Sequence, residues 1–421
     1  MLAFRILFFV VALALVVGMN VFLYRRLVRD VTESRLARRV GLGLLVVLGL
    51  GVPLGRLGLG FFTPTWLAGG LMAWWGVALY VLLALLGLEV VRLWALRRAP
   101  KIAAPQRSVT IAPELEPALE GRGGGPALAT AAPEVSRAEP ELIDDPSRRL
   151  FISRAVAAGA VVIGGGVSSL GVYRAYTPPE VSVIPVKLPG LPKALDGFSI
   201  VQLSDIHVGP VIQEKFLDQL VSVANAAKPD LVAITGDLAD GSPARLGGFV
   251  ARFQNLASRH GTYFVSGNHD YYSGWEAWAT ALGGLGFNVL RNRAVVIGEP
   301  GASFDLIGVD DWGSRWMGGG YDLDAATSGR DPERPSVLMA HQPLNLEAVA
   351  EKRIGLQLSG HTHGGQIFPG PFIARMIYGD HVEGLSRAGD TQVYTSRGCG
   401  FVGPPMRVGS PPEVVKIVLV A

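Results

Sequence analysis

Two histidines one residue apart stand out in the segment LSGHTHGGQ, residues 358–366. Side chains at positions i and i+2 point the same way on a strand, and in a tight loop bounded by glycine both can converge on one point. His361 and His363 therefore have a spacing that suits a metal centre. The alternative is a polar turn in which two histidines happen to be neighbours, because a short motif alone has many chance matches.

Five segments of the chain share one pattern, in which a short apolar run ends abruptly in Asp, His, Asn or Gly. They are FSIVQLSDIH, DLVAITGDL, GTYFVSGNHD, PSVLMAHQP and IGLQLSGHTHGG. Amphipathic stretches such as 214–227 separate some of these runs, and strands that alternate with helices predict a layered α/β domain with its functional residues at the carboxyl ends of the strands. The ligand types suit Mn, Fe, Zn or Mg. The single cysteine, Cys399, excludes an internal disulfide and a CxxC zinc site.

A carboxylate shared by two cations can hold them about 3.5–4 Å apart, where they clamp a phosphoryl group and acidify a bound water. The polar ends of the five runs resemble, in order, the five sequence blocks of the calcineurin-like metallophosphoesterase superfamily. These are SDIHVG (204–209), GDLAD (236–240), GNHD (267–270), AHQP (340–343) and GHTHGGQ (360–366). The first and last forms, with the preceding Arg pair at 148–149, look most like the YkuE/YaeI-type membrane-associated branch. The resemblance implies a four-layer α/β/β/α sandwich.

The resemblance also implies two divalent metal ions that share one carboxylate, with Mn, Fe or Zn foremost and Mg as a further option. One ion would be held by Asp205, His207, Asp237 and His363. The other would be held by Asp237, Asn268, His341 and His361. His269 would stay off the metals, as the acid for the leaving group or as a stabiliser of the transition state. Asp270 would either orient His269 or cap a helix.

The segment 396–413 (SRGCGFVGPPMRVGSPPE) resembles the closing segment of the same branch. Arg397 and Arg407 are expected to form ion pairs with the acidic surface of the domain, and contact with the phosphate is the alternative. Cys399 lies between two glycines, so we expect a small residue in a tight turn rather than a nucleophile.

The first 173 residues are of a different kind. The chain has a mean hydropathy of +0.34 with 17% charged residues, and the apolar excess is concentrated near the N-terminus. Uncharged stretches at 6–24, 40–55 and 57–88 predict three transmembrane helices within a membrane region at 1–98. Residues 99–147 are rich in Pro, Ala and Gly and predict a disordered linker. Residues 148–173 form a further apolar segment, and 174–421 would be the metallophosphoesterase domain.

The distribution of charge predicts the topology. Residues 1–173 hold 18 Lys/Arg and 11 Asp/Glu, whereas 174–421 hold 20 and 24, so the basic excess belongs to the membrane region and does not indicate nucleic-acid binding. Six arginines at 24–39 and a basic cluster at 92–107 mark cytoplasmic loops, which places the N-terminus outside and residue 100 inside.

The segment SRRLFIS at 147–153, followed by the weakly apolar stretch 155–173, resembles a twin-arginine export signal in an internal position. An ordinary fourth span is the alternative, and both place 174–421 outside the cell. A third option leaves 155–173 on the membrane surface and the domain in the cytoplasm.

These features together predict a membrane-tethered, dinuclear metal-dependent phosphoesterase. His269 favours a phosphodiesterase, because an acid suits alkoxide leaving groups, and the tether favours a phospholipid or cell-envelope phosphodiester as substrate. A pyrophosphatase acting on a nucleotide-linked lipid such as UDP-2,3-diacylglucosamine is the alternative, and it requires a cytoplasmic domain. A non-catalytic membrane sensor is a third hypothesis, which the complete ligand set disfavours. The expected partners are the membrane, a phosphoester substrate that can be lipid-linked, and export machinery.

Overall fold

The structure is a computed structural model that describes residues 2–50, 65–97, 101–103, 142–144 and 146–421. Residues 51–55 of the predicted second span, 57–64 of the predicted third span and most of the predicted linker at 99–147 lie outside the described residues.

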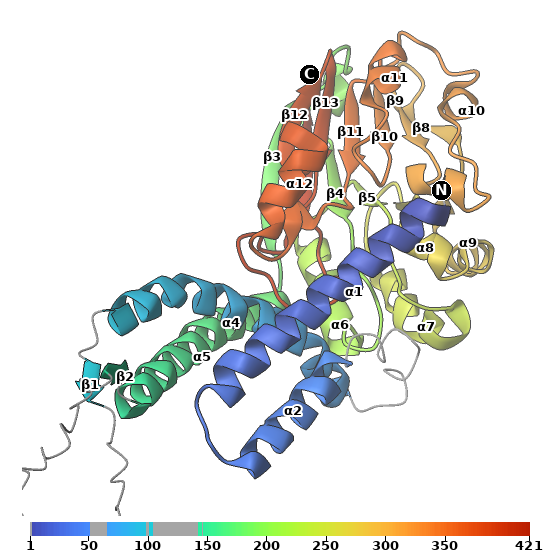
Figure 1. Cartoon of the computed structure of the whole chain (residues 1–421). Coiled ribbons are helices and arrows are strands. Elements are labelled where there is room, and N and C mark those ends of the chain that lie inside the picture. Colours follow the sequence, from blue (N-terminus) through green and yellow to red (C-terminus); the bar gives the residue numbers. More distant parts are fainter. Residues whose placement is uncertain (1, 51–64, 98–100, 104–141, 145) are drawn as a thin grey trace, which may run out of the picture.

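The domain at 174–421 is built on two mixed sheets of six strands each (Figure 1). One sheet has the strand order β3-β14-β4-β5-β6-β7, with strands Glu180–Lys187, Glu413–Val420, Ser199–Leu203, Leu231–Ile234, Thr262–Phe264 and Asn288–Val289. The other has the order β12-β13-β11-β10-β9-β8, with strands Gly384–Ala388, Thr391–Thr395, Leu356–Ser359, Ser336–Met339, Ala302–Gly308 and Arg293–Glu299. Strands β4, β5 and β6 are parallel, as are β9, β10, β11 and β13. Their carboxyl ends therefore lie along one edge of each sheet.

Successive side chains along each strand point to opposite faces of the sheet, and this divides the core into layers. On β5, Leu231 and Ala233 face the opposite sheet, whereas Val232 and Ile234 face helices. The outer face of the β4–β6 sheet is covered by α6 (Glu214–Ala226), α7 (Pro243–Val250) and α9 (Trp275–Gly284). The outer face of the β9–β11 sheet packs on α10 (Leu323–Thr327) and α11 (Leu346–Glu351). The predicted four-layer sandwich is confirmed.

Two further helices lie in loops that follow strands of the sandwich. They are α8 (Asn268–Tyr272), which follows β6, and α12 (Gly370–Tyr378), which follows β11.

The N-terminal region is helical. Its elements are α1 (Leu2–Tyr24), the π-helical segment η1 (Arg25–Arg29), α2 (Arg35–Gly49), α4 (Thr65–Arg97) and α5 (Pro146–Tyr176). Within the described residues, two helices are long and apolar enough to cross a membrane, at Trp66–Ala95 and Ser147–Tyr176. These correspond to the third predicted span and to the export-like segment, whose SRRLFIS motif forms the first turns of α5. Strands β1 (Lys101–Ala103) and β2 (Leu142–Asp144) pair antiparallel between the two helices.

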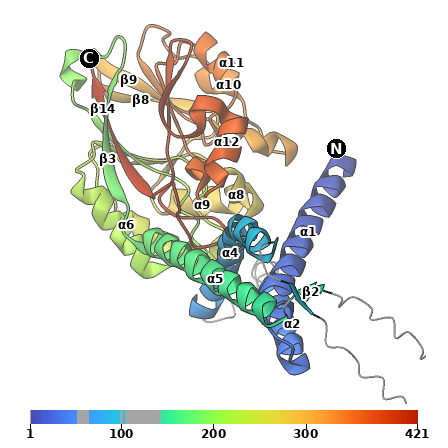
Figure 2. The ribbon, with the colours of Figure 1, turned by 60° about the vertical axis from the view of Figure 1, so that its left-hand side comes forward.

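Helices α4 and α5 pack against each other as an antiparallel hairpin (Figure 2). Small residues allow the close approach, as at Gly164, where a Cβ atom would overlap the backbone of Val81. Gly159 lies against Leu88 one helical turn further towards the connection between the helices. At the other end the hairpin contacts the domain, because Gly76 meets Met406 and the Gly171 carbonyl accepts a hydrogen bond from the backbone N–H of Arg407 at 2.9 Å.

Candidate metal centre

The loops after five strands bring the predicted ligands to one place. Asp205 and His207 follow β4, Asp237 follows β5, Asn268 begins α8 after β6, His341 follows β10, and His361 and His363 follow β11. All are buried except His361, which is half-buried. Candidate ligand atoms lie within 4.8 Å of one another in three overlapping groups. The groups are Asp205, His207 and His363; Asp237, His341 and His361; and His207, Asp237 and His269.

An unusual backbone conformation aims these side chains. Asp205, His207, Asp237, His361 and His363 all have positive φ, between 51° and 71°. The left-handed region is uncommon for residues other than glycine, and such strain concentrates at functional sites. Glycine supplies the remaining space, since a Cβ atom on Gly360 would overlap the carboxylate of Asp205. The glycines on both sides of HTH in the sequence are thus part of the site.

The first group has the spacing of a cation site. Nε2 of His207 and Nε2 of His363 are 3.1 Å apart, and Nε2 of His363 is 3.4 Å from Oδ1 of Asp205. The Asp205 carboxylate is held in place by the backbone N–H of His361, which donates to both of its oxygens at 3.0 Å. The predicted first ligand set is therefore assembled around converging nitrogen and oxygen atoms.

The second group centres on Asp237. Nε2 of His341 lies 3.2 Å from Oδ2 of Asp237, and Nε2 of His207 lies 3.7 Å from the same oxygen. Asp237 is thus placed between the two groups, where a bridging carboxylate is needed. Nδ1 of His341 donates to the Thr235 carbonyl at 2.8 Å, which leaves the lone pair of Nε2 free to coordinate a cation at the centre.

The donor set fits two divalent cations. Nε2 of His341 and Oδ1 of Asn268 are buried and have no hydrogen-bond partner in the described part of the chain. Buried polar atoms are normally satisfied, and a cation would satisfy both of these. Burial lowers the pKa of His361 to about 3, and the neutral imidazole is the form that binds a metal.

His269 has a partner that the sequence reasoning missed. Oδ1 of Asp240 accepts from Nδ1 of His269 at 2.6 Å and from Nδ1 of His207 at 3.1 Å. Burial opposes ionisation of Asp240, but the two histidines hold its pKa below the usual range. Burial also disfavours the imidazolium of His207, yet Asp240 raises the pKa of His207 to about 9. Asp240 is the last residue of the GDLAD block, so the signal was present in the sequence.

Asp270 does not orient His269. Its carboxylate accepts from the backbone N–H groups of Asp237, Leu238 and Gly267 at 2.7–3.0 Å. This arrangement caps α8 and fixes the loop that carries Asp237. The helix-capping alternative is therefore the role that the structure shows.

The closing segment lies beneath the first ligand group. Arg397 forms the expected ion pair, with Glu413 at 2.7 Å. Arg407 does not: it is fully buried, donates to the carbonyls of Arg397 and His363, and places Nη2 3.1 Å from Nδ1 of His363. Burial lowers the pKa of Arg407 to about 10, so the side chain still carries its charge at neutral pH. Cys399 is buried.

Comparison with known proteins agrees with this geometry. Residues 198–365 match the family model for calcineurin-like phosphoesterases. A transmembrane protein with a metallophosphoesterase domain from Bos taurus is 38% identical over 290 residues, which cover 66% of this chain and 64% of that relative. The chain thus spans slightly less than two thirds of that protein.

Two further similarities extend this comparison. The metallophosphoesterase YkuE of Bacillus subtilis is 31% identical over 286 residues, which cover 65% of this chain and 97% of YkuE. A crystal structure of a dimetal phosphatase from Danio rerio is similar with a TM-score of 0.36 at 13% identity, covering 53% of this chain and 93% of that one. The chain belongs to the calcineurin-like phosphoesterase family.

Proposed function

We propose that this protein is a membrane-tethered phosphodiesterase that hydrolyses a phospholipid or another lipid-linked phosphodiester. The observation that carries the proposal is an exposed apolar helix, α12, which lies directly beside the metal centre. The ring of Tyr378, the last residue of α12, is 5.9 Å from the ring of His361. The first turn of α12 packs on Gly365 of the ligand loop.

The outward face of α12 is apolar. Phe372, Ile373, Met376 and Ile377 are 57–86% exposed, and Phe368 before the helix is 43% exposed. A helix with a contiguous exposed apolar face marks an interaction site, and such a face can lie in the boundary between headgroups and acyl chains.

The position of α12 supports a lipid contact. The backbone N–H of Phe368 donates to the carbonyl of Val408. The residue before Val408, Arg407, is hydrogen-bonded to α5. The apolar face is therefore carried by the part of the domain that the membrane hairpin holds.

The chemistry at the centre suits a diester. When bound, two divalent cations supply Lewis-acid stabilisation and an activated water. His269 lies off the two predicted ligand sets, and its Nδ1 is occupied by Asp240. Its Nε2 is thus available to hold a proton for an alkoxide leaving group. A monoester with an acidic leaving group has less need of that acid.

The same arrangement supports an extracytoplasmic domain. Arginines of η1, α2 and the start of α5 gather at the hairpin end opposite the domain, and basic residues mark the cytoplasmic side. Because α4 and α5 are antiparallel along their length, a crossing by one implies a return by the other. Protease added to intact spheroplasts should digest 174–421 while a cytoplasmic marker survives. Protection of both would favour the nucleotide-linked lipid pyrophosphatase.

The decisive experiment compares two substrates. The full-length protein with Ile373→Gln and Met376→Gln should hydrolyse soluble bis(p-nitrophenyl) phosphate normally. Its KM for phospholipid in vesicles should rise about tenfold or more, because each apolar side chain contributes about 1.5–3 kcal/mol when buried. Val296→Gln, an exposed apolar residue on β8, is the matched control and should change neither rate.

Three results would overturn the proposal. One is an unchanged vesicle rate in the α12 variant. The second is an absence of phospholipid hydrolysis by an enzyme that is active on the soluble diester. The third is retained metal-dependent activity in Asp237→Asn, which would place the chemistry elsewhere.

A further inference from the structure

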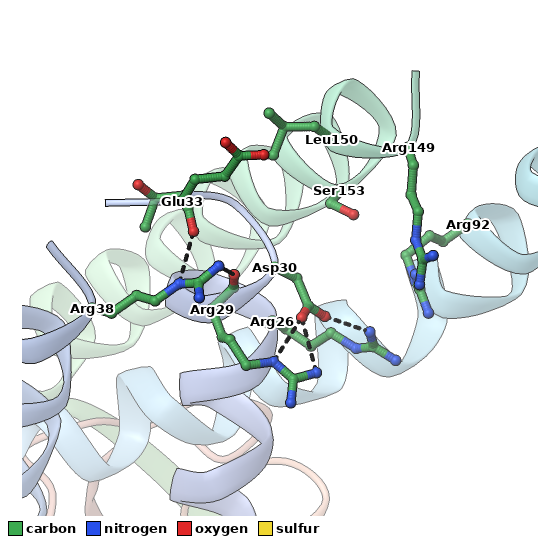
Figure 3. Close-up of a pocket in the computed structure, with 10 residues that line it drawn as sticks. Arg26, Arg29, Asp30, Glu33, Arg38, Arg92, Arg149, Leu150 and Ser153 are labelled. Atoms are coloured by element: carbon green, nitrogen blue, oxygen red, sulfur yellow. Dashed lines mark hydrogen bonds and ion pairs between the residues drawn. The ribbon is translucent and has the colours of Figure 1, made fainter. Parts of the chain in front are cut away.

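We propose that the arginine-lined cavity at the end of the helix hairpin binds the phosphate group of an anionic phospholipid. The cavity has a volume of about 310 Å³ and is separate from the metal centre. Its walls come from η1, the turn after it, α2, α4 and α5. Five of the lining residues are arginines: Arg26, Arg29, Arg38, Arg92 and Arg149 (Figure 3).

The cations of the cavity exceed its acids. Arg26 pairs with Asp30 and with Glu89, each at 2.8 Å. Arg29 shares Asp30 at 3.1 Å, and Arg92 shares Glu89 at 2.6 Å. Three arginines thus compete for two carboxylates. Of these two carboxylates only Asp30 lines the cavity, and the other acid in the lining, Glu33, is exposed.

Two arginines have no carboxylate partner within the described ranges. Arg38 donates to the backbone carbonyls of Thr32 and Arg29 at 2.9 and 3.1 Å, and these contacts orient its guanidinium without neutralising it. Arg149, in the first turn of α5, has no ion pair among the described residues. Nε of Arg26 is buried and has no hydrogen-bond partner in the same part of the chain. An anion in the cavity would complement all three groups.

Guanidinium groups bind phosphate with two parallel, charge-assisted hydrogen bonds, so phosphate matches the lining better than a carboxylate or a halide does. A signal for membrane topology needs positive charge alone, in any arrangement. Here arginines from four helical segments surround one cavity, and η1 is a π-helix, a rare conformation that often accompanies functional sites.

The place of the cavity along the hairpin identifies the phosphate as a lipid headgroup. Arg149 and Gly171, where α5 contacts the domain, are separated by about 33 Å of helix at 1.5 Å per residue. That length matches the hydrocarbon core of a bilayer, which is about 30 Å thick. The cavity therefore lies at the headgroup layer of one leaflet when the domain lies at the other. Basic pockets between membrane helices are known sites for anionic headgroups.

The test uses the full-length protein in a zwitterionic detergent, with dihexanoylphosphatidylglycerol and inorganic phosphate as separate probes of binding in calorimetry. The variant Arg38→Gln/Arg149→Gln should bind the lipid at least tenfold more weakly. Arg25→Gln removes a charge from the same π-helical segment but does not line the cavity, and it should bind within twofold of the wild type. Hydrolysis of a soluble diester, measured at the metal centre, reports whether each variant is folded.

The outcomes separate the sources of phosphate. Lipid binding that exceeds phosphate binding and depends on Arg38 and Arg149 supports a headgroup site. Equal binding of both probes would overturn the lipid assignment and leave a site for free phosphate. No binding of either probe, or lipid binding that the double variant leaves unchanged in a folded protein, would overturn the site itself.

Discussion

Replacing Asp240 by Asn tests how the protein controls His269, the proposed leaving-group acid. The wild-type carboxylate accepts two hydrogen bonds from histidines, at 2.6 Å from His269 and 3.1 Å from His207. Asn keeps the shape of the side chain but removes the charge. A hydrogen bond to a charged group contributes about 1.5–3 kcal/mol. At 1.36 kcal/mol per factor of ten, losing the bond to His269 should lower kcat/KM about 10- to 150-fold.

A comparison of two substrates shows whether the loss of kcat/KM is caused by a weaker proton donor at His269. A diester with an alkoxide leaving group needs a proton donor and should show the full loss. A p-nitrophenolate leaving group needs little protonation and should show a loss below about threefold. Rates must be measured at saturating metal, because an outer partner of a ligand such as His207 also changes metal affinity about 10- to 100-fold.

The control is Asp390→Asn, which removes an exposed carboxylate on the turn between β12 and β13 and should not change either rate. An equal loss on both substrates would show that Asp240 does not act through an acid. An unchanged kcat/KM on the alkoxide diester would refute the role of Asp240 altogether.

Three further predictions follow from the same region. Dialysis against EDTA should abolish hydrolysis and lower Tm, and Mn²⁺ should restore both. A cation that binds only the folded state and is present at 100 times its Kd adds about 2.7 kcal/mol to the free energy of unfolding. An unchanged Tm would argue against a buried centre. Gly360→Ala should destabilise the domain by about 1–3 kcal/mol in urea unfolding, because the added methyl group would overlap Ser204 and Asp205. Burial raises the pKa of the Cys399 thiol to about 12, so a disulfide reagent at pH 8 should label one thiol per chain in guanidinium and none in the folded protein.

The sequence predicted well which candidate metal ligands lie together, because each of them follows a strand within one of the five sequence blocks. Short apolar runs ending in Asp, His or Asn predicted both the sandwich and the edge where the ligands meet, because parallel strands present their carboxyl ends together. The sequence does not predict the direction in which a side chain points after a left-handed turn. Asp240 lies four residues after Gly236 and Asp270 lies three residues after Gly267, and this spacing does not show which carboxylate reaches His269. That depends on how the loops after β5 and β6 pack against each other.

Burial in the folded chain also explains why the sequence did not predict the role of Arg407 or of the stretch 155–173. The sequence predicted that Arg407 lies at the surface. In the structure Arg407 is buried beneath His363 and its partners are backbone carbonyls. The stretch 155–173 is only weakly apolar, so hydropathy alone left its role open between a span, an export signal and a surface segment. In the structure its small residues pack closely along α4, and this packing needs glycine and alanine rather than the most hydrophobic residues.

The contact between α5 and the domain gives the membrane helix a direct mechanical connection to the metal centre. The backbone N–H of Arg407 bonds to Gly171 in α5, and the guanidinium of the same residue lies 3.1 Å from His363. A shift of α5 therefore moves the residue that packs beneath one of the proposed ligands, because a closely packed interior transmits displacement. The hairpin thus restrains the centre, and under the proposed membrane tether activity should depend on the lipid that surrounds the helices.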